Sequence, residues 1–597
     1  MPSMFVRKVV DKKTGYIRVQ ICSNIREGKK VKQKIIKHVA VAHNEFEYEK
    51  FYKLAVAFID FEKEKLNNSP LLFENTFDLL ENHTQVKPLK KPQKHTIKDE
   101  NQSKNDGDLK ISINNMSEEK RVIEGTYDFY GLLFNKFGFD KIFNKKSNSN
   151  LLRDLIVERI SNPKSKLKTH ANILKNFGKA KSLSSIYNLI DKLDEKYQDI
   201  IDLTFSCTSS LFENKINMVF FDVTTLYFES VKDDDLRKFG YSKDQQFHSI
   251  QVTLALATTS DGMPIGYKLF PGNTGEVSTL LNCIEEWKKT LPIMDVTFVC
   301  DRGLFSFNNL YEIEKRGFKF IVAIPLKKLD EAKKCLILKK HDENSSLYSP
   351  VFLNENKKLY WTQEISHEQV GKIELPKEQQ KNRKKFIEVA VKGKIICTYN
   401  FYRAQKDEKD RKIMLDKMMK NFDNKTTKTK KFISNGGYKK YLSEKIKGVV
   451  ELNESKIEED KRWDGLHGIF TNTNFSTKET IQKYKELVFI ENSFRLSKTF
   501  LRMRPVYHYK SSRIRGHVSL CYLALCLTKY ADKILKNKNI NISPDVLREE
   551  LTSIQSSYIR DKSTNNLYKM PSKMSDLSKK IYDALELKRE NSVRTIQ

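Results

Sequence analysis

The chain has 597 residues, more than one hydrophobic core normally serves, which predicts two to four domains. Its 108 Lys and Arg against 76 Asp and Glu give a formal charge of +32, which favours a polyanionic partner such as DNA, RNA or an anionic membrane. No C-x-x-C pair occurs, and the longest apolar run, residues 518–527, is far shorter than the roughly 20 residues of a membrane span. We therefore expect a cytoplasmic protein with reduced thiols, no zinc site and no membrane segment.

The N-terminal part, residues 1–66, is predicted to be a small β/α module. Residues 5–42 alternate apolar and basic positions around two turn sequences, which predicts a β-meander, and residues 45–65 have helical spacing. This module either faces DNA or presents an ordinary solvated sheet face. Residues 67–115 are polar and are expected to form a flexible linker.

Residues 116–211 are predicted to form a helical domain. Residues 151–160 bury one apolar stripe, Pro163 follows this stripe, and Ser184 to Leu193 begin another helix. A basic helical domain of this kind serves DNA-end binding or dimerisation, and a plain scaffold is an equally good interpretation.

The pattern changes to α/β from residue 212. Short apolar runs predict strands at residues 218–221, 250–259, 265–270, 296–300 and 320–324, with a helix at 276–289. This order is typical of the opening of a ribonuclease-H-like fold, although other mixed sheets fit the periodicity.

We accordingly expect an α/β protein whose ribonuclease-H-like catalytic core is interrupted by an inserted β-rich domain. The first part of this core would be residues 212–325, the inserted domain 326–477, the second part 478–535, and a C-terminal region 536–597. Helices are predicted at 478–500 and 513–531.

Two aspartates follow apolar strand sequences. Asp222 comes directly after residues 218–221, and Asp301 directly after residues 296–300. A carboxylate at a buried strand end must be paired or bind a cation, and two on neighbouring strands suit a hard divalent ion. Each aspartate alone would more often be a turn or helix-cap residue.

The predicted helix at 478–500 carries a third carboxylate. Tyr484, Glu491, Arg495 and Lys498 recur at intervals of seven, four and three residues, which places them on one face. The ordinary interpretation is an exposed Glu491–Arg495 pair on a surface helix.

Taken together, these segments resemble those of DDE transposases of bacterial insertion sequences, in the branch with a Tyr-x2-Arg-x3-Glu-x6-Lys signature. Tyr484, Glu491 and Lys498 match this signature, whereas Leu487 occupies the Arg position. Residues 240–244, 270–274 and 504–508 are similar to the same branch, and the resemblance spans residues 151–527.

The resemblance implies the chemistry. Asp222, Asp301 and Glu491 would be the catalytic residues and would bind two Mg²⁺ ions, with Mn²⁺ able to substitute. Tyr484, Arg495 and Lys498 would bind the DNA backbone. The partner would be double-stranded DNA, both element ends and target, bound by a homodimer assembled on it, with ends recognised by the N-terminal region and the insert.

Two other functions remain open from the sequence. One is a catalytically inactive, transposase-derived DNA-binding protein, against which the intact carboxylate set argues. The other is a different ribonuclease-H-like nuclease, which would cut DNA or RNA without joining ends.

Overall fold

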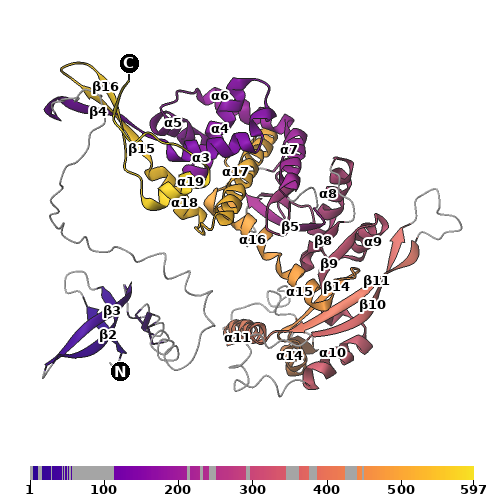
Figure 1. The fold of residues 1–597 in the computed structure, drawn as a ribbon. Coiled ribbons are helices and arrows are strands. Elements are labelled where there is room, and N and C mark those ends of the chain that lie inside the picture. The colour runs from indigo at the N-terminus through magenta and orange to yellow at the C-terminus, as the bar shows by residue number, and fades with distance from the viewer. Residues whose placement is uncertain are drawn as a thin grey trace. The chain divides into compact units, whose positions relative to one another are not determined.

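The computed structural model describes residues 4–10, 16–27, 30–42, parts of 45–56, 113–211, 216–228, 233–240, 250–290, 296–343, 362–374, 386–423, 440–446 and 449–596. They belong to two compact units, Met1–Lys104 with Pro350–Lys358 and Asn105–Ser349 with Leu359–Gln597, which we describe separately (Figure 1). The predicted linker lies outside the described residues except for its end, a 3₁₀ turn at Ile113–Asn115.

The first unit contains an antiparallel three-stranded sheet. Strands β1 (Met4–Val10), β2 (Ile17–Glu27) and β3 (Lys30–Ala42) lie in the order β1-β2-β3, so the predicted meander is confirmed. Val19 and Ile21 are buried against Tyr48 and Phe51, two residues of the segment with helical spacing. The predicted residues 57–65 of that segment lie outside the described ones.

The second unit is built on an eight-stranded sheet in the order β10-β11-β14-β9-β8-β5-β6-β7. Strands β5 (Met218–Tyr227), β6 (Gln251–Thr258) and β7 (Pro264–Pro271) are antiparallel neighbours. Helix α8 (Glu276–Thr290) then leads to β8 (Thr297–Cys300), which is parallel to β5. A 3₁₀ turn (Arg302–Leu304) and α9 (Phe307–Lys315) precede β9 (Lys319–Ile324), which is parallel to β8. All five predicted strands and the predicted helix are therefore present.

The strands between residues 326 and 477 extend this same sheet. Strands β10 (Thr362–Glu374), β11 (Phe386–Tyr399) and β14 (Leu466–Thr471) add to the edge of β9 in antiparallel pairing. Between them lie α11 (Phe401–Asp423), the hairpin β12 (Leu442–Ile446) and β13 (Val449–Leu452), and α14 (Glu454–Lys461). A 3₁₀ turn (Leu326–Lys328) and α10 (Glu331–Glu343) begin the segment. The boundaries of an inserted domain stay a prediction.

A group of helices covers the other end of the sheet. These are α3 (Gly125–Lys136), the 3₁₀ turn Phe139–Ile142, α4 (Lys146–Ser161), α5 (Lys166–Phe177), α6 (Leu183–Glu195) and α7 (Tyr197–Ser210). The long helix α17 (Ser511–Asn537) packs against α3, α4, α6, α7 and β7. The helices and the sheet therefore share one hydrophobic core.

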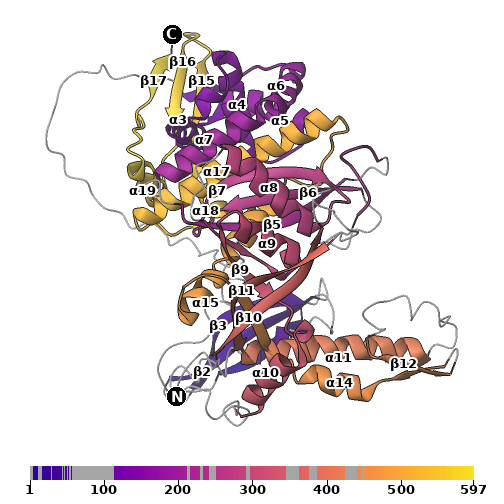
Figure 2. The same cartoon turned by 90° about the vertical axis from the view of Figure 1, so that its right-hand side faces the viewer.

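The start of the predicted helical domain is a strand instead. Strand β4 (Met116–Ile123) pairs with β15 (Gln555–Asp561) in a four-stranded sheet completed by β16 (Leu567–Pro571) and β17 (Arg594–Ile596). Helices α18 (Pro544–Ser553) and α19 (Asp576–Ala584) accompany these strands. Figure 2 shows β15, β16 and β17 beside the helical group.

The predicted helix 478–500 is divided into three pieces. Helix α15 (Thr477–Lys485) begins at Ser476, whose side chain forms a capping box with Glu479. After a turn at Glu486 and Leu487 come α16 (Val488–Arg495) and a π-helical turn (Leu496–Phe500). In the described ranges, no helix has the length and apolar character needed to cross a membrane.

Candidate active site

Asp222 and Asp301 occupy matching positions on two adjacent parallel strands. Phe221 on β5 is in register with Cys300 on β8, and each aspartate is the next residue of its chain. Asp301 directly follows its strand, as predicted. Asp222 was predicted at a strand end but lies inside β5, opposite Leu256 of β6, because pairing with β6 continues to Tyr227.

Both aspartates are half-buried and make local hydrogen bonds. Oδ1 of Asp222 accepts from the Val223 amide at 2.7 Å, and Oδ1 of Asp301 accepts from the Gly303 amide at 2.8 Å. Asp301 therefore caps the 3₁₀ turn that follows it, as the ordinary interpretation expected. Burial, then the charges of Asp301 and Asp222, raise the pKa of the Cys300 thiol, which places both carboxylates within electrostatic reach of one sulfur atom.

Glu491 lies on the helix that covers the face toward which Asp222 points. The ring of Phe221 contacts Trp287 of α8 with centroids 6.1 Å apart. Because side chains alternate along a strand, Asp222 points to the opposite face. Helix α16 packs against β5 and β6 and lies across β5 from α8 (Figure 1), held by buried Ile490 and Phe494. Glu491 itself is solvent-exposed.

Tyr484 connects the two parts of the site. Burial raises the pKa of its phenol, the charges of Asp301 and Glu491 raise it further, and the charge of Arg403 opposes them. The phenol is therefore neutral at physiological pH and lies near both carboxylates. Its ring contacts the imidazole of His467 with centroids 5.2 Å apart.

The other signature positions are placed differently. Leu487 is only 8% exposed and belongs to the hydrophobic core. Arg495 is exposed, and its charge acts on Lys529 of α17. Lys498 is half-buried within the π-helical turn, so its direction departs from the α-helical spacing used to predict it.

Three residues near the site were not foreseen from the sequence. His467 of β14 has its pKa lowered to about 4 by burial and then by the charges of Arg403 and Arg302, so its imidazole is neutral. Arg403 of α11 acts on both His467 and Tyr484. Arg403 is brought to Tyr484 only by the fold, because α11 is far from α15 in sequence, whereas His467 lies on β14, the strand directly before α15.

Glu276 is the third unforeseen residue. A Cβ atom built on Gly303 would lie 2.5 Å from Oε2 of Glu276 and 3.1 Å from Oδ1 of Asp301, so the two carboxylates approach the same glycine. A cavity of about 370 Å³ lies beside it, lined in part by Glu276, Gly303 and Thr225. The segment just before Glu276, residues 270–274, was the only sequence signal.

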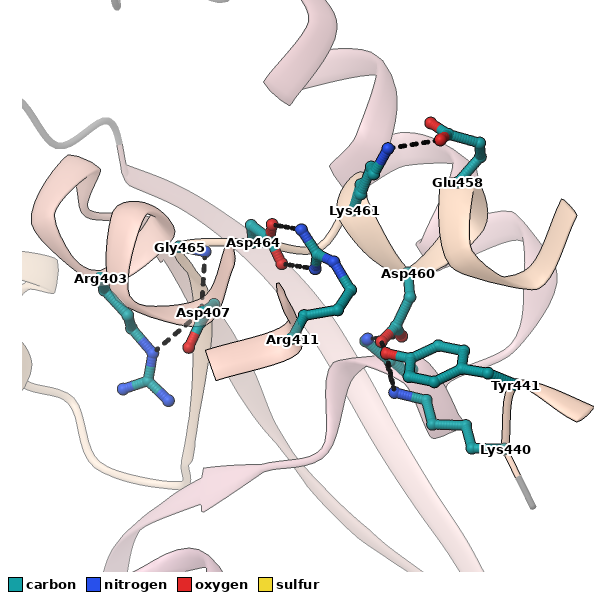
Figure 3. A network of polar contacts seen from close by, with 11 residues as sticks. Arg403, Asp407, Arg411, Lys440, Tyr441, Glu458, Asp460, Lys461, Asp464 and Gly465 are labelled. Carbon is teal, nitrogen blue, oxygen red and sulfur yellow. Dashed lines mark hydrogen bonds and ion pairs between the residues drawn. The ribbon is translucent and has the colours of Figure 1, made fainter. Parts of the chain in front are cut away.

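A polar network fixes the helix that carries Arg403 (Figure 3). Asp407 accepts a hydrogen bond from the Gly465 amide at 3.0 Å and pairs with Arg403 at 3.8 Å. One turn further along, Arg411 forms two hydrogen bonds with Asp464. Gly465 has a φ of +75°, which a glycine adopts without strain. These contacts attach α11 to the turn that leads into β14.

The donor chemistry of the site fits a hard divalent cation. Mg²⁺ binds through one or two carboxylates and otherwise keeps waters and substrate phosphates, so the paired Asp222 and Asp301 are a suitable protein contribution. Among the residues that the structure describes, no group of three or more His, Cys, Asp or Glu side chains could hold a metal ion. The structure therefore brings the two aspartates together without closing a three-carboxylate cluster around them.

Comparisons with known proteins bear on the family. A search of curated protein sequences gives no match. Among solved structures, the piggyBac transposase synaptic complex with hairpin DNA is similar at 8% identity and a TM-score of 0.32, covering 72% of this chain and 77% of that one. The Mos1 transposase paired-end complex with left transposon end is similar at 15% identity and a TM-score of 0.13, covering 28% and 56%. With TM-scores this low, neither likeness bears on the fold or function of this chain.

The match to a protein family comes from the sequence itself. Residues 213–527, more than half of the chain, match the Transposase DDE domain. This range includes both aspartates, the intervening strands and the helix of Glu491. The chain therefore belongs to the family of proteins with a transposase DDE domain.

Proposed function

We propose that this protein is the DNA transposase of a bacterial insertion sequence, which cuts at the element ends and joins them to target DNA. The observation that carries the proposal is the register of β5 and β8, which places Asp222 and Asp301 side by side. The order β7-β6-β5-β8-β9, three antiparallel strands and then two parallel ones, supports a ribonuclease-H-like core.

Asp222, Asp301 and Glu491 would hold the divalent metal, two Mg²⁺ ions with Mn²⁺ able to substitute. When bound, such ions activate a water or 3′-hydroxyl nucleophile and stabilise the leaving oxygen in displacement at phosphorus. Glu491 lies on α16, against the strand of Asp222, and would complete the ligand set. Members of this family generally use divalent metal ions, which agrees with this donor set.

The neighbouring residues position the DNA. The neutral phenol of Tyr484 can donate a hydrogen bond to a phosphate oxygen beside the metal site. Lys498, in the π-helical turn after α16, supplies positive charge for the DNA backbone. Arg403 supplies positive charge from the side of β14. Leu487, at the Arg position of the signature, is buried and supplies none. Arg495, whose charge acts on Lys529 of α17, would also contact the DNA backbone.

The partners follow from this chemistry. The protein would act in the cytoplasm on double-stranded DNA, both element ends and target, as a homodimer assembled on that DNA. The basic β-meander of the first unit, with Lys30, Lys32, Lys34 and Lys37 along β3, is the candidate for end recognition.

The test is cleavage by three conservative variants, Asp222→Asn, Asp301→Asn and Glu491→Gln. Each removes an anionic ligand oxygen at almost constant volume, so we expect nicking and strand transfer to be lost while DNA binding is kept. The substrate is a supercoiled plasmid carrying the DNA that flanks the gene, in Mg²⁺.

Asp202→Asn, on the exposed side of α7, is the matched control and should cut normally. Near-normal cutting by any of the three variants would remove that residue from the site. Cleavage without joining of ends would indicate another nuclease, and binding without cleavage by the unmodified protein would indicate an inactive descendant.

A further inference from the structure

A second cavity, of about 380 Å³, lies between α4, α5, α6, α17 and the loop at residues 502–508. Its wall includes Arg159, Lys166, Arg504, His508 and His517, together with the exposed ring of Tyr507. Among the described residues that line it there is no carboxylate. Its volume is many times the roughly 30 Å³ share of one water molecule, so a phosphate group has room to enter.

Two of the basic side chains in this wall are buried and form no ion pair within the described residues. Arg159 is 5% exposed and Lys166 is 4% exposed. Within the described ranges Arg159 makes no hydrogen bond or ion pair, and Lys166 contacts only the neutral ring of His517, from Nζ to Nδ1 at 3.2 Å. Asp191, the carboxylate that acts on His508, is already paired with Arg513 at 3.3 Å and Lys510 at 3.5 Å.

The charges of these basic side chains also act on the two histidines of the wall. His517 contacts the carbonyl oxygen of Met503 through Nε2 at 3.1 Å, so Nε2 donates and Nδ1 accepts from Lys166. Burial and then the charges of Lys166 and Arg159 lower the pKa of His517. Burial and the charges of Lys166, Arg513 and Arg159 lower the pKa of His508 to about 4. Both rings are therefore neutral. Burial and then the charge of Arg159 also lower the pKa of the Lys166 amine well below its usual value, so an anion in the cavity would favour the charged form of this lysine.

The backbone at the start of α5 also attracts anions to this cavity. Helix α5 begins at the cavity, with Ser165 as its N-cap and the lining residues Lys164 to Leu167 around its first turn. The amides and the dipole at a helix N-terminus attract anions, and here they act together with buried Arg159 and Lys166. An arginine, a lysine and a helix N-terminus around one cavity form a site for a phosphate.

The loop at residues 502–508 also joins this cavity to the catalytic strand. Arg504 lies over the ring of Tyr227 at 5.3 Å, and the Val506 amide donates to the Tyr227 carbonyl at 3.3 Å. Tyr227 is five residues beyond Asp222 on β5, about 16 Å at roughly 3.3 Å per residue. That length corresponds to about five nucleotide steps at 3.4 Å per step. Beside the cavity, Tyr507 and Tyr509 are exposed aromatic rings, which suit nucleic acid.

We propose that this cavity, built by Arg159, Lys166 and the start of α5, binds one backbone phosphate of the DNA several nucleotides from the cleaved bond. The DNA source of the phosphate rests on the proposed function, whereas the anion site itself does not. A bound phosphate would be a counter-ion for buried Arg159 and would favour the charged form of Lys166.

The test compares Lys166→Met with the matched variant Lys168→Met, an exposed lysine on the same helix that does not line the cavity. Inorganic phosphate should raise the melting temperature of the full chain and of Lys168→Met through specific binding. Lys166→Met should lose most of this rise and keep only the general effect of an excluded salt, which all variants share. Equal rises in both variants would overturn the proposal.

The DNA arm measures duplex binding against salt concentration. Loss of one phosphate contact should lower the slope of log affinity against log salt by about 0.9 in Lys166→Met and leave Lys168→Met unchanged. A phosphate response without this change in slope would assign the cavity to a free anion and overturn the DNA contact. Because Lys166→Met could fail to fold, the wild-type protein gives a second measurement. Saturating duplex DNA should remove the specific effect of phosphate on its melting temperature. If that effect persists with duplex bound, DNA does not occupy the cavity.

The same measurements on Asp222→Asn separate the two proposals. This variant should keep both the phosphate response and the salt slope. If the protein cuts DNA but shows no phosphate response, only the cavity proposal fails. If the phosphate response is present and no cleavage occurs, only the proposed function fails.

Discussion

At the scale of single residues, the site is defined by which charges lie near one another. Asp222 and Asp301 could be predicted because both follow apolar runs, and adjacent strands placed them in register. Arg403, His467 and Glu276 could not, because each comes from an element whose packing brings it to the site. Leu487, at the Arg position of the signature, belongs to the hydrophobic core, and sequence spacing could not show that the charge of Arg495 acts on Lys529.

Lys498 gives a prediction at this scale. If it neutralises a phosphate beside the cleaved bond, Lys498→Ala should cost about 1 to 3 kcal/mol in the cleavage step, roughly a 5- to 150-fold slower rate. Lys478→Ala, an exposed lysine at the start of α15, serves as the control and should change the rate little. Single-turnover cleavage at saturating Mg²⁺ and DNA measures both rates. An unchanged rate for Lys498→Ala would mean that this residue makes no phosphate contact in the cleavage step.

Glu158 predicts how stability depends on pH. Burial raises the pKa of its carboxyl to about 7 from 4.5, while hydrogen bonds from Asn172 and Asn176 and the charge of Arg159 oppose the rise. Between these values the folded state keeps a proton that the unfolded state releases, so this group's contribution to stability falls as pH rises from 4.5 to 7.

Glu158→Gln should therefore stabilise the protein more at pH 8 than at pH 4.5, by up to about 3.5 kcal/mol at about 1.4 kcal/mol per pKa unit. Urea unfolding at both pH values measures this difference. Glu195→Gln, exposed at the end of α6, is the control and should show no such pH dependence. The same free-energy difference between wild type and Glu158→Gln at both pH values would contradict the buried, raised carboxyl.

At the scale of elements, apolar runs predicted the central strands, but features that depend on pairing between distant segments could not be predicted. Strand β4 was missed because Met116–Ile123 is largely polar and pairs with β15, more than 400 residues later. The continuation of β5 past Asp222 depends on pairing with β6. Hydrophobic spacing does not show the break between α15 and α16 or the π turn at Lys498, because these depend on how the helices pack on the sheet.

Helix α11 gives a prediction at this scale. Arg411 is buried and bonds Asp464 through two nitrogens, so Arg411→Met leaves that carboxylate without its partner. Breaking such a pair costs up to about 3 to 5 kcal/mol. Amide exchange in α11 should become faster while β5 is unchanged, and cleavage should fall because α11 carries Arg403 toward Tyr484.

Lys461→Met is the matched control for this change. Its partner Glu458 and Lys461 itself are both largely exposed, so the pair contributes little and exchange in α11 should stay as in the wild type. If amide exchange in α11 is as slow in Arg411→Met as in the wild type, apolar contacts and not this ion pair hold the helix.

At the scale of the whole molecule, the division into two units decides which parts can be removed. The helices α3 to α7 share a core with α17 and β7, so a fragment starting near residue 216 would lose packing on both. Tyr197 of α7, for example, donates a hydrogen bond to the Tyr267 carbonyl at 2.7 Å. The first unit, by contrast, has its own small core around Val19 and Ile21.

A chain starting at Asn105 should therefore keep the fold of the second unit and lose Met1–Lys104, the main part of the first unit. We expect it to cut plasmid DNA in Mg²⁺, because Asp222, Asp301, Glu491 and Tyr484 all belong to the second unit. Its preference for the element's own ends over random DNA should disappear, and its remaining affinity should depend steeply on salt because phosphate contacts dominate it. Competition binding at physiological salt measures the preference, and circular dichroism during thermal unfolding checks the fold. If the shortened chain still selects end sequences, recognition lies in the second unit, and the basic strands of the first unit serve another purpose.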